Sequence, residues 1–255
     1  MSMVLTALKD IPLIRQGDDL ADVILSALPS NGIAMQDNDI FVIGQKVVSK
    51  AEGRMVNLDD VTPSPGATKL AAEVDKDARL MELMLQESRS VVRTRPGTVI
   101  VEHNLGFICA NAGIDHSNVA GPGDEHGEFV LLLPRDPDAS CATMRQKLES
   151  VSGKRLGVMI IDSHGRAWRI GTVGMCIGLN GIPAVLDERG WPDLFGYTLR
   201  ITMVGVADEL AAAASLLMGQ AAEGTPIVHV RGFPYALRDG SLRDLIRPRE
   251  LDLFR

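Results

Sequence analysis

The sequence lacks the short motifs that identify many nucleotide-binding and hydrolytic enzymes. It contains no GxxxxGK(S/T) phosphate-binding loop, no GxGxxG, no HExxH and no GxSxG. A nucleotide, if one is bound, must therefore be held by a less common arrangement of side chains and backbone.

Aromatic residues, cysteine and long apolar runs are also scarce. Aromatics make up 4% of the chain, and 33 acidic against 26 basic residues give a net charge of -7, which argues against a nucleic-acid partner. The three cysteines form no CxxC pair, so we expect them to be buried thiols in a reducing compartment. No apolar run approaches the ~20 residues of a membrane helix, and the first residues do not resemble a signal peptide. These features predict a cytoplasmic protein that does not associate with a membrane.

What the sequence does contain is an alternation of apolar runs and helix-like segments. With 255 residues of which 45% are hydrophobic, it can form one unit over 1–255, with room for two intimate subdomains but no separable linker. The pattern predicts an α/β or α+β fold, with mixed sheets and flanking helices. Strands rich in Val and Ile are expected at 40–43, 99–101, 158–161, 201–206 and 227–230.

Helical spacing is found in three segments. It covers 66–89, then 138–148 with a cap from Asp138, Ala139 or Ser140, and then 208–218, which ends at Gly219. Proline and glycine predict surface loops at 59–66 and 120–128.

Polar residues that follow the strand at 158–161 are the first candidates for chemistry. Asp162 and Ser163 would lie at the end of a buried strand, where α/β proteins bind ligands, and Arg166 could hold a phosphate or a carboxylate. Oxygen donors of this kind suit Mg²⁺ or Mn²⁺. A turn-capping role for Asp162 explains the same residues. His164 and His116 could each act as an acid or a base, but neither has an evident partner, so both are expected to be ordinary surface histidines.

Two further segments carry polar groups near strand ends. Asp115 and Asn118 could share a metal or a nucleotide, or could simply form Asx turns. Lys46 and Lys50 could meet phosphates as point charges, or could lie on a solvated edge. The Gly-punctuated turn over 218–226 could wrap a ligand with its backbone.

Taken together and in this order, seven segments resemble one family, the coenzyme F420:L-glutamate ligases. They are IPLI (11–14), KVVSKAEG (46–53), AGIDHSNV (112–119), DPDAS (136–140), DSHGRAWR (162–169), ADELAAAA (207–214) and MGQAAEG (218–224). The resemblance extends from about residue 11 to about residue 233 and is to the stand-alone form of these γ-glutamyl ligases.

The resemblance implies a reaction, its cofactors and a set of site residues. GTP would phosphorylate the terminal carboxylate of a deazaflavin coenzyme precursor, and the amine of L-glutamate would then displace phosphate, with GDP as the other product. Two divalent cations, Mn²⁺ or Mg²⁺, would assist, one at Asp115 and Asp162 and the other at Ser163 and Gln220. Lys50 and Arg166 would be catalytic. The nucleotide would be surrounded by Ile11, Pro12, Leu13, Ile14, Gln45, Lys46, Lys50, Asn118, Met218, Gly219, Gln220, Ala221, Ala222, Glu223, Gly224 and Thr225.

The resemblance also implies an unusual ligase fold that forms an intertwined homodimer. Three other functions stay open on the residues alone. They are a metal-dependent nucleotide hydrolase, an amide ligase for a different acid and amine, and a non-catalytic nucleotide-binding oligomer.

Overall fold

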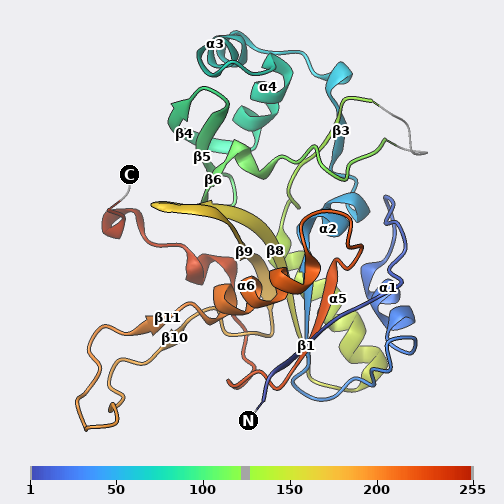
Figure 1. The fold of residues 1–255 in the computed structure, drawn as a ribbon, viewed down its shortest axis with the longest axis vertical. Coiled ribbons are helices and arrows are strands. Elements are labelled where there is room, and N and C mark those ends of the chain that lie inside the picture. Colours follow the sequence, from blue (N-terminus) through green and yellow to red (C-terminus); the bar gives the residue numbers. More distant parts are fainter. Residues whose placement is uncertain (1, 122–126, 254–255) are drawn as a thin grey trace.

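In a computed structural model, which describes residues 2–121 and 127–253, five strands form a central sheet (Figure 1). The pair β2–β8 is parallel, whereas the other neighbouring pairs are antiparallel. The expected mixed α/β fold is confirmed, as are the strands at 40–43, 158–161 and 227–230. Across the sheet the strands are β1 (Val4–Ala7), β12 (Ile227–Arg231), β2 (Ile40–Gly44), β8 (Gly157–Arg166) and β9 (Arg169–Asn180).

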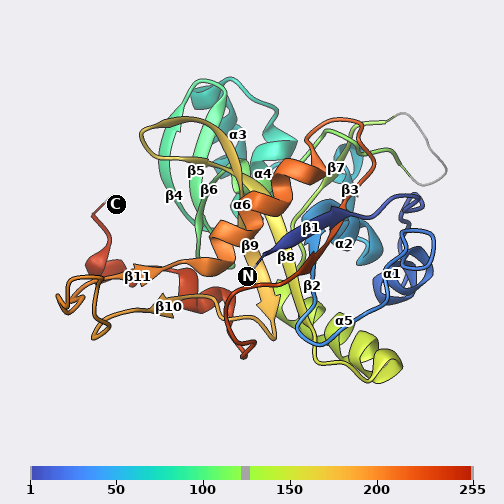
Figure 2. The same cartoon turned by 60° about the horizontal axis from the view of Figure 1, so that its bottom comes forward.

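Helices cover both faces of this sheet. Phe41 and Ile43 pack on one side with α1 (Leu20–Ala27) and α5 (Pro137–Ser152). Ile40 and Val42 pack on the other side with α6 (Val206–Met218), which lies across the sheet in Figure 2. Because both faces are covered, the central strands are continuously apolar rather than alternating.

Residues 55–133 leave the sheet and build a second, smaller core. The segment leaves through β3 (Met55–Asn57) and returns through β7 (Phe129–Leu131), and these two strands pair with each other. The residues between these two strands in the sequence form this core, in which Val74, Met81 and Val101 are fully buried. Its helices are α3 (Pro65–Val74) and α4 (Ala78–Gln86), and its sheet consists of β4 (Ser88–Arg95), β5 (Thr98–His103) and β6 (Ile108–Ala110).

The single helix expected over 66–89 is wrong. Asp75 adopts the left-handed conformation, with φ +54°, and ends α3. Asp77 then accepts a hydrogen bond from the backbone of Arg79 and begins α4. The apolar spacing continues through this break because both helices turn their apolar faces to the same core, so spacing alone could not reveal it.

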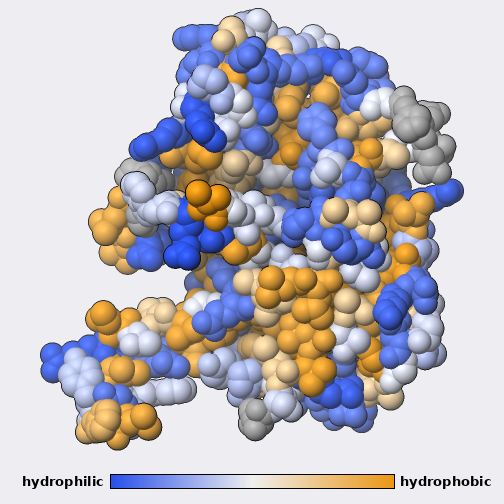
Figure 3. Space-filling model, in the orientation of Figure 1, coloured by the Kyte–Doolittle hydropathy of each residue, from blue (hydrophilic) through white to orange (hydrophobic). Residues whose placement is uncertain are grey.

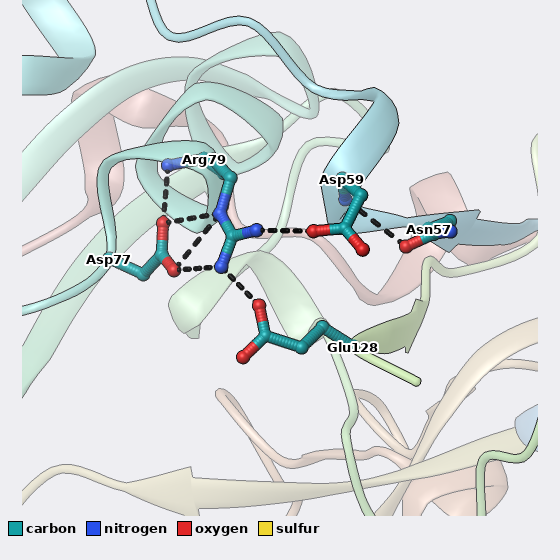
Figure 4. Close-up of polar contacts among 5 residues, drawn as sticks. All are labelled: Asn57, Asp59, Asp77, Arg79 and Glu128. Carbon is teal, nitrogen blue, oxygen red and sulfur yellow. Dashed lines mark hydrogen bonds and ion pairs between the residues drawn. The ribbon is translucent and has the colours of Figure 1, made fainter. Parts of the chain in front are cut away.

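Arg79 ties three segments of the small subdomain together (Figure 4). Its guanidinium contacts Asp59 at 2.9 Å, Asp77 at 2.6 Å and the carboxylate of Glu128. The hydrogen bonds that it donates to the carboxylates of Asp77 and Glu128 raise its pKa above the ordinary arginine value. The chain is therefore anchored beside α4 just before it enters β7. Part of the loop expected at 120–128 lies outside the described residues.

A hairpin arm extends from the body between β9 and α6 (Figure 1). The strand expected at 201–206 is confirmed only as the two residues of β11 (Met203–Val204), which pair with β10 (Leu186–Asp187), because α6 begins at Val206. Ile201 is 88% exposed, so its apolar run belongs to the arm and not to the core. Short 3-10 helices complete the described chain at Leu58–Asp60, Asn111–Gly113, Leu242–Leu245 and Arg249–Leu251.

Helix α6 and the three cysteines agree with the sequence analysis, whereas the cap of α5 differs from it. The helix at 208–218 is confirmed as α6, ending at Gly219. Helix α5 is capped by Asp136 rather than by 138–140, since Asp136 accepts from the backbone of Ala139, while Asp138 accepts from the backbone of Leu179. All three cysteines are buried and free, as expected. Within the described part of the chain, no helix has the length and apolar character to cross a bilayer.

A buried ionic contact fixes the start of β2 against the end of β12. Asp39 is 1% exposed and accepts from both Nε and Nη2 of Arg231, at 2.9 and 2.7 Å. The Nε2 atom of His229 lies 2.9 Å from the same carboxylate. Burial alone would raise the pKa of Asp39, but the hydrogen bonds from Arg231 and His229 outweigh it and hold the pKa well below the ordinary range.

Asp39→Asn should lower the free energy of unfolding by about 2–4 kcal/mol at neutral pH, because it leaves Arg231 without its charged partner. A depressed folded-state pKa stabilises the fold above the ordinary carboxyl pKa of about 3.9, and this contribution is lost as pH falls further. Urea unfolding at pH 7 and pH 3 should show the advantage of the wild type shrinking at the lower pH. The exposed Asp60→Asn is the control, and equal stabilities for Asp39→Asn and wild type would contradict the prediction.

Candidate active site

A pocket of about 850 Å³ opens where β2 ends and β8 continues. Gly44, the last residue of β2, pairs with Ile161, so β8 has no parallel neighbour beyond this point. Asp162 and Ser163 line the pocket in the space that β2 leaves. The strand was expected to stop at Asp162, which is wrong: it continues to Arg166 because β9 pairs with it along this length.

Helix α2 (Gln45–Ala51) follows β2 directly and supplies two lysines to the pocket. Lys46 donates to the hydroxyl and the carbonyl of Ser117, at 2.8 and 3.2 Å. Lys50 donates to the carbonyl of Asn118 at 2.8 Å. Burial and the neighbouring charge of Lys46 lower the pKa of Lys50. The two amines lie one helical turn apart and face the same loop.

Asp115 stands at the start of that loop. Its backbone pairs with Leu131, and its carboxylate accepts from Nε2 of Gln45 at 2.7 Å, while Lys46 lies 3.5 Å from the other oxygen. Burial and the negative charge of Asp162 raise the pKa of Asp115 to about 6, although Lys46 and Gln45 act in the opposite direction. The negative charge of Asp162, which comes from a different element, thus acts on the buried carboxylate of Asp115.

The turn after α6 forms the opposite wall. Residues 218–226 line the pocket, and Asn118 donates to the carbonyl of Ala221 at 2.9 Å, which connects this turn to the loop. Ser163 donates to Oε1 of Gln220 at 2.9 Å. Gly219 has φ +70° and ψ -173°, a conformation that is essentially restricted to glycine.

These donors fit a hard divalent cation. Four side chains offer oxygen, namely those of Asp115, Asp162, Ser163 and Gln220. The hydroxyl oxygen of Ser163 and Oε1 of Gln220 lie 2.9 Å apart. In the described residues no three His, Cys, Asp or Glu side chains gather as a complete ligand set. A cation here would need further oxygens, and Mg²⁺-type sites commonly obtain these from water and substrate phosphates.

Comparison with known proteins identifies the family. The F420-0:Gamma-glutamyl ligase family matches residues 9–232. Coenzyme F420:L-glutamate ligase of Methanothermobacter thermautotrophicus is 45% identical over 257 residues, covering 100% of both chains. The enzymes of that name from Methanopyrus kandleri and Archaeoglobus fulgidus are 43% and 42% identical, covering 97% and 96% of this chain and 97% and 93% of their own. The chain belongs to the F420-0:γ-glutamyl ligase family.

The structure brings together most of the residues that resemblance to these ligases singled out. Leu13, Ile14, Gln45, Lys46, Lys50, Asn118, Asp162, Ser163 and residues 218–225 all line the pocket. Asp115 does not itself line the pocket, but its carboxylate contacts Gln45 and Lys46, which do. Ile11 and Pro12 precede the lining residues, and Arg166 lies farther along β8, where it donates to the carbonyl of Gly171 at 3.4 Å. The catalytic role expected of Arg166 stays a prediction.

The sequence analysis missed several residues that line this pocket. Arg15, Gln16 and Ser215 line it, and the first two could have been found because they directly follow Ile14. His164 is 6% exposed rather than a surface residue, and its Nε2 lies 3.1 Å from Asp162. The burial of His164 depends on the pairing of β8 with β9, which the sequence alone did not reveal. His116 is exposed, as expected.

Gly219→Ala should damage the pocket wall, because alanine avoids this backbone conformation and because the added Cβ, 2.2 Å from the Glu223 carboxyl carbon, would push that carboxylate off the backbone N–H of Ala221. We expect a loss of about 1–3 kcal/mol in the free energy of unfolding, and ligase activity reduced roughly 10- to 100-fold by misplacement of the turn. Gly224→Ala is the control for a positive φ alone, since Gly224 has φ +69° but its Cβ would meet no atom within 4 Å. If both variants lose activity equally, the clash at Glu223 does not matter.

Proposed function

We propose that the protein joins L-glutamate to the coenzyme F420 precursor in a GTP-dependent reaction that passes through an acyl phosphate. The precursor carboxylate would attack the γ-phosphorus of GTP, and GDP would leave. The amine of glutamate would then attack the acyl carbon, forming the C–N bond as phosphate departs with the bonding electrons. The observation that carries this proposal is that Lys46, Lys50 and Asp162 line one pocket, with Asp115 in contact with Lys46, in a chain of this family.

The two lysines suit the phosphates of the nucleotide. Phosphoryl transfer depends on positioning and on cations placed where charge develops. Lys46 and Lys50 now donate to uncharged oxygens of residues 117 and 118. A phosphate oxygen is a stronger acceptor because it is charged, so bound GTP would draw the amines from these oxygens. Lys50, being buried on one side, would interact with the phosphate through little intervening water.

The four oxygen donors are the proposed metal ligands. Asp115 and Asp162 would hold one divalent cation, and Ser163 and Gln220 the other. Bound there, Mg²⁺ or Mn²⁺ would neutralise phosphate charge and orient the transferring group. The raised pKa of Asp115 supports this assignment, because burial and the charge of Asp162 both disfavour its carboxylate form, which a bound cation would stabilise.

We also propose that the protein acts as a homodimer. The arm between β10 and β11 extends from the body, and apolar side chains lie along it at the lower left of Figure 3. Large apolar side chains that are gathered on an exposed arm commonly mark a protein–protein interaction site. The most exposed large apolar residues of the arm are Leu194, Phe195, Tyr197 and Ile201. A second copy of the chain is the occupant that the family resemblance implies.

Mass spectrometry of the F420 precursor, incubated with GTP, L-glutamate and Mn²⁺, should show a mass increase of one or more glutamyl units. Asp162→Asn should abolish the increase and weaken Mn²⁺ binding while the fold persists, because it removes charge and keeps shape. GTP hydrolysis without a glutamyl product would favour a hydrolase. Nucleotide binding without any turnover would favour a non-catalytic oligomer, and either result would reject the proposed ligation.

Sedimentation velocity over a dilution series should show a dimer that dissociates only at low concentration. The double variant Leu194→Ser, Phe195→Ser should shift the equilibrium toward monomer, since it removes apolar area from the arm. Leu253→Ser, at an exposed apolar position near the end of the described chain, is the control. A fully active wild-type monomer at micromolar concentration would contradict the dimer but not the ligase.

A further inference from the structure

Gln45 was expected to contact the nucleotide, yet the structure commits both ends of its side chain to protein groups. It is the first residue of α2 and is 2% exposed. Its Nε2 donates to Asp115 at 2.7 Å, and its Oε1 accepts from the hydroxyl of Ser49 at 2.9 Å. We propose that Gln45, oriented by Ser49, is a positioning residue that fixes the Asp115 carboxylate for a divalent cation. This inference rests on the metal site proposed above.

The direction of the Gln45 amide follows from its partners. A carboxylate can only accept, so the group that faces Asp115 must be the NH₂ end. The Ser49 hydroxyl then donates to the oxygen end, which carries no hydrogen. The reverse orientation would place the amide oxygen 2.7 Å from a carboxylate oxygen, where two acceptors repel. Ser49 thus stabilises the one orientation in which Gln45 is useful to Asp115.

Asp115 needs such a restraint because its backbone alone does not fix its side chain. Its N–H and C=O pair with Leu131, which holds the main chain but leaves the carboxyl group free to rotate. Gln45 holds Oδ2, and Lys46 lies 3.5 Å from Oδ1. Each oxygen keeps lone pairs for a cation. Lys46 is the candidate to leave when phosphate arrives, whereas Gln45 carries no charge and has no reason to move.

Ser49 makes the inference testable because its side chain does not line the pocket in which the nucleotide and the cation would bind. It is fully buried, follows Gln45 by one helical turn, and is not among the described residues that line the pocket. It can influence a bound cation only through Gln45. Outer groups that orient a metal ligand typically change metal affinity about 10- to 100-fold when they are removed.

The test measures Mn²⁺ affinity directly by electron paramagnetic resonance, without turnover, in Gln45→Leu and Ser49→Ala. We expect Gln45→Leu to weaken Mn²⁺ binding roughly 10- to 100-fold and Ser49→Ala to weaken it in the same direction by less. Nucleotide affinity, measured in EDTA with a fluorescent GTP analogue, should stay at the wild-type value. Gln45→Asn, which keeps the amide but shortens its reach, serves if Gln45→Leu does not fold.

Val48→Ala is the matched control, because Val48 is buried in the same helix but contacts the core instead of Asp115. It should lower stability and leave Mn²⁺ affinity unchanged. Weaker metal-free nucleotide binding in Gln45→Leu, with normal Mn²⁺ affinity, would make Gln45 a nucleotide ligand and overturn the inference. So would a Ser49→Ala variant that matches Val48→Ala in Mn²⁺ affinity. A wild type that binds no Mn²⁺ would instead reject the metal site itself.

Discussion

The parallel pairing of β2 with β8 is the constraint on which the pocket depends. Because Gly44 pairs with Ile161, the chain can turn into α2 at the point where Asp162 and Ser163 begin. A shift of one residue would turn Asp162 to the opposite face of the sheet. Such a slip would also move Met159 and Ile161 of β8 out of their core, so packing of both faces holds the register that the chemistry needs.

The charged groups of the site come from elements that approach from different directions. The lysines come from α2, Asp115 comes from the small subdomain and Asp162 comes from the hairpin of β8 and β9. Carbonyl and hydroxyl oxygens accept hydrogen bonds from the two lysines, and the amide of Gln45 restrains Asp115. Contacts within the protein thus hold the side chains of the site, which reduces the ordering that binding must impose.

The sequence was sufficient for the central strands and for most of the pocket. Strands such as Ile40–Gly44 are apolar on both faces and bounded by polar residues, so local pattern identifies them. The break at Asp75 was hidden because helical spacing continues across it, and the extension of β8 depends on pairing with β9, which a single segment does not encode. The resemblance placed Gln45 at the site, but its partner Asp115 is 70 residues away and only the fold brings them together.

The route of the chain through residues 55–133 has a mechanical consequence. Asp115 adjoins the core of the small subdomain, whereas Asp162 belongs to the strand packed in the main one. Any ligand that contacts both carboxylates therefore bridges two separately packed subdomains, and its binding free energy opposes their separation. Local unfolding of the small subdomain would break this bridge. A saturating ligand should therefore make the two subdomains unfold in one transition.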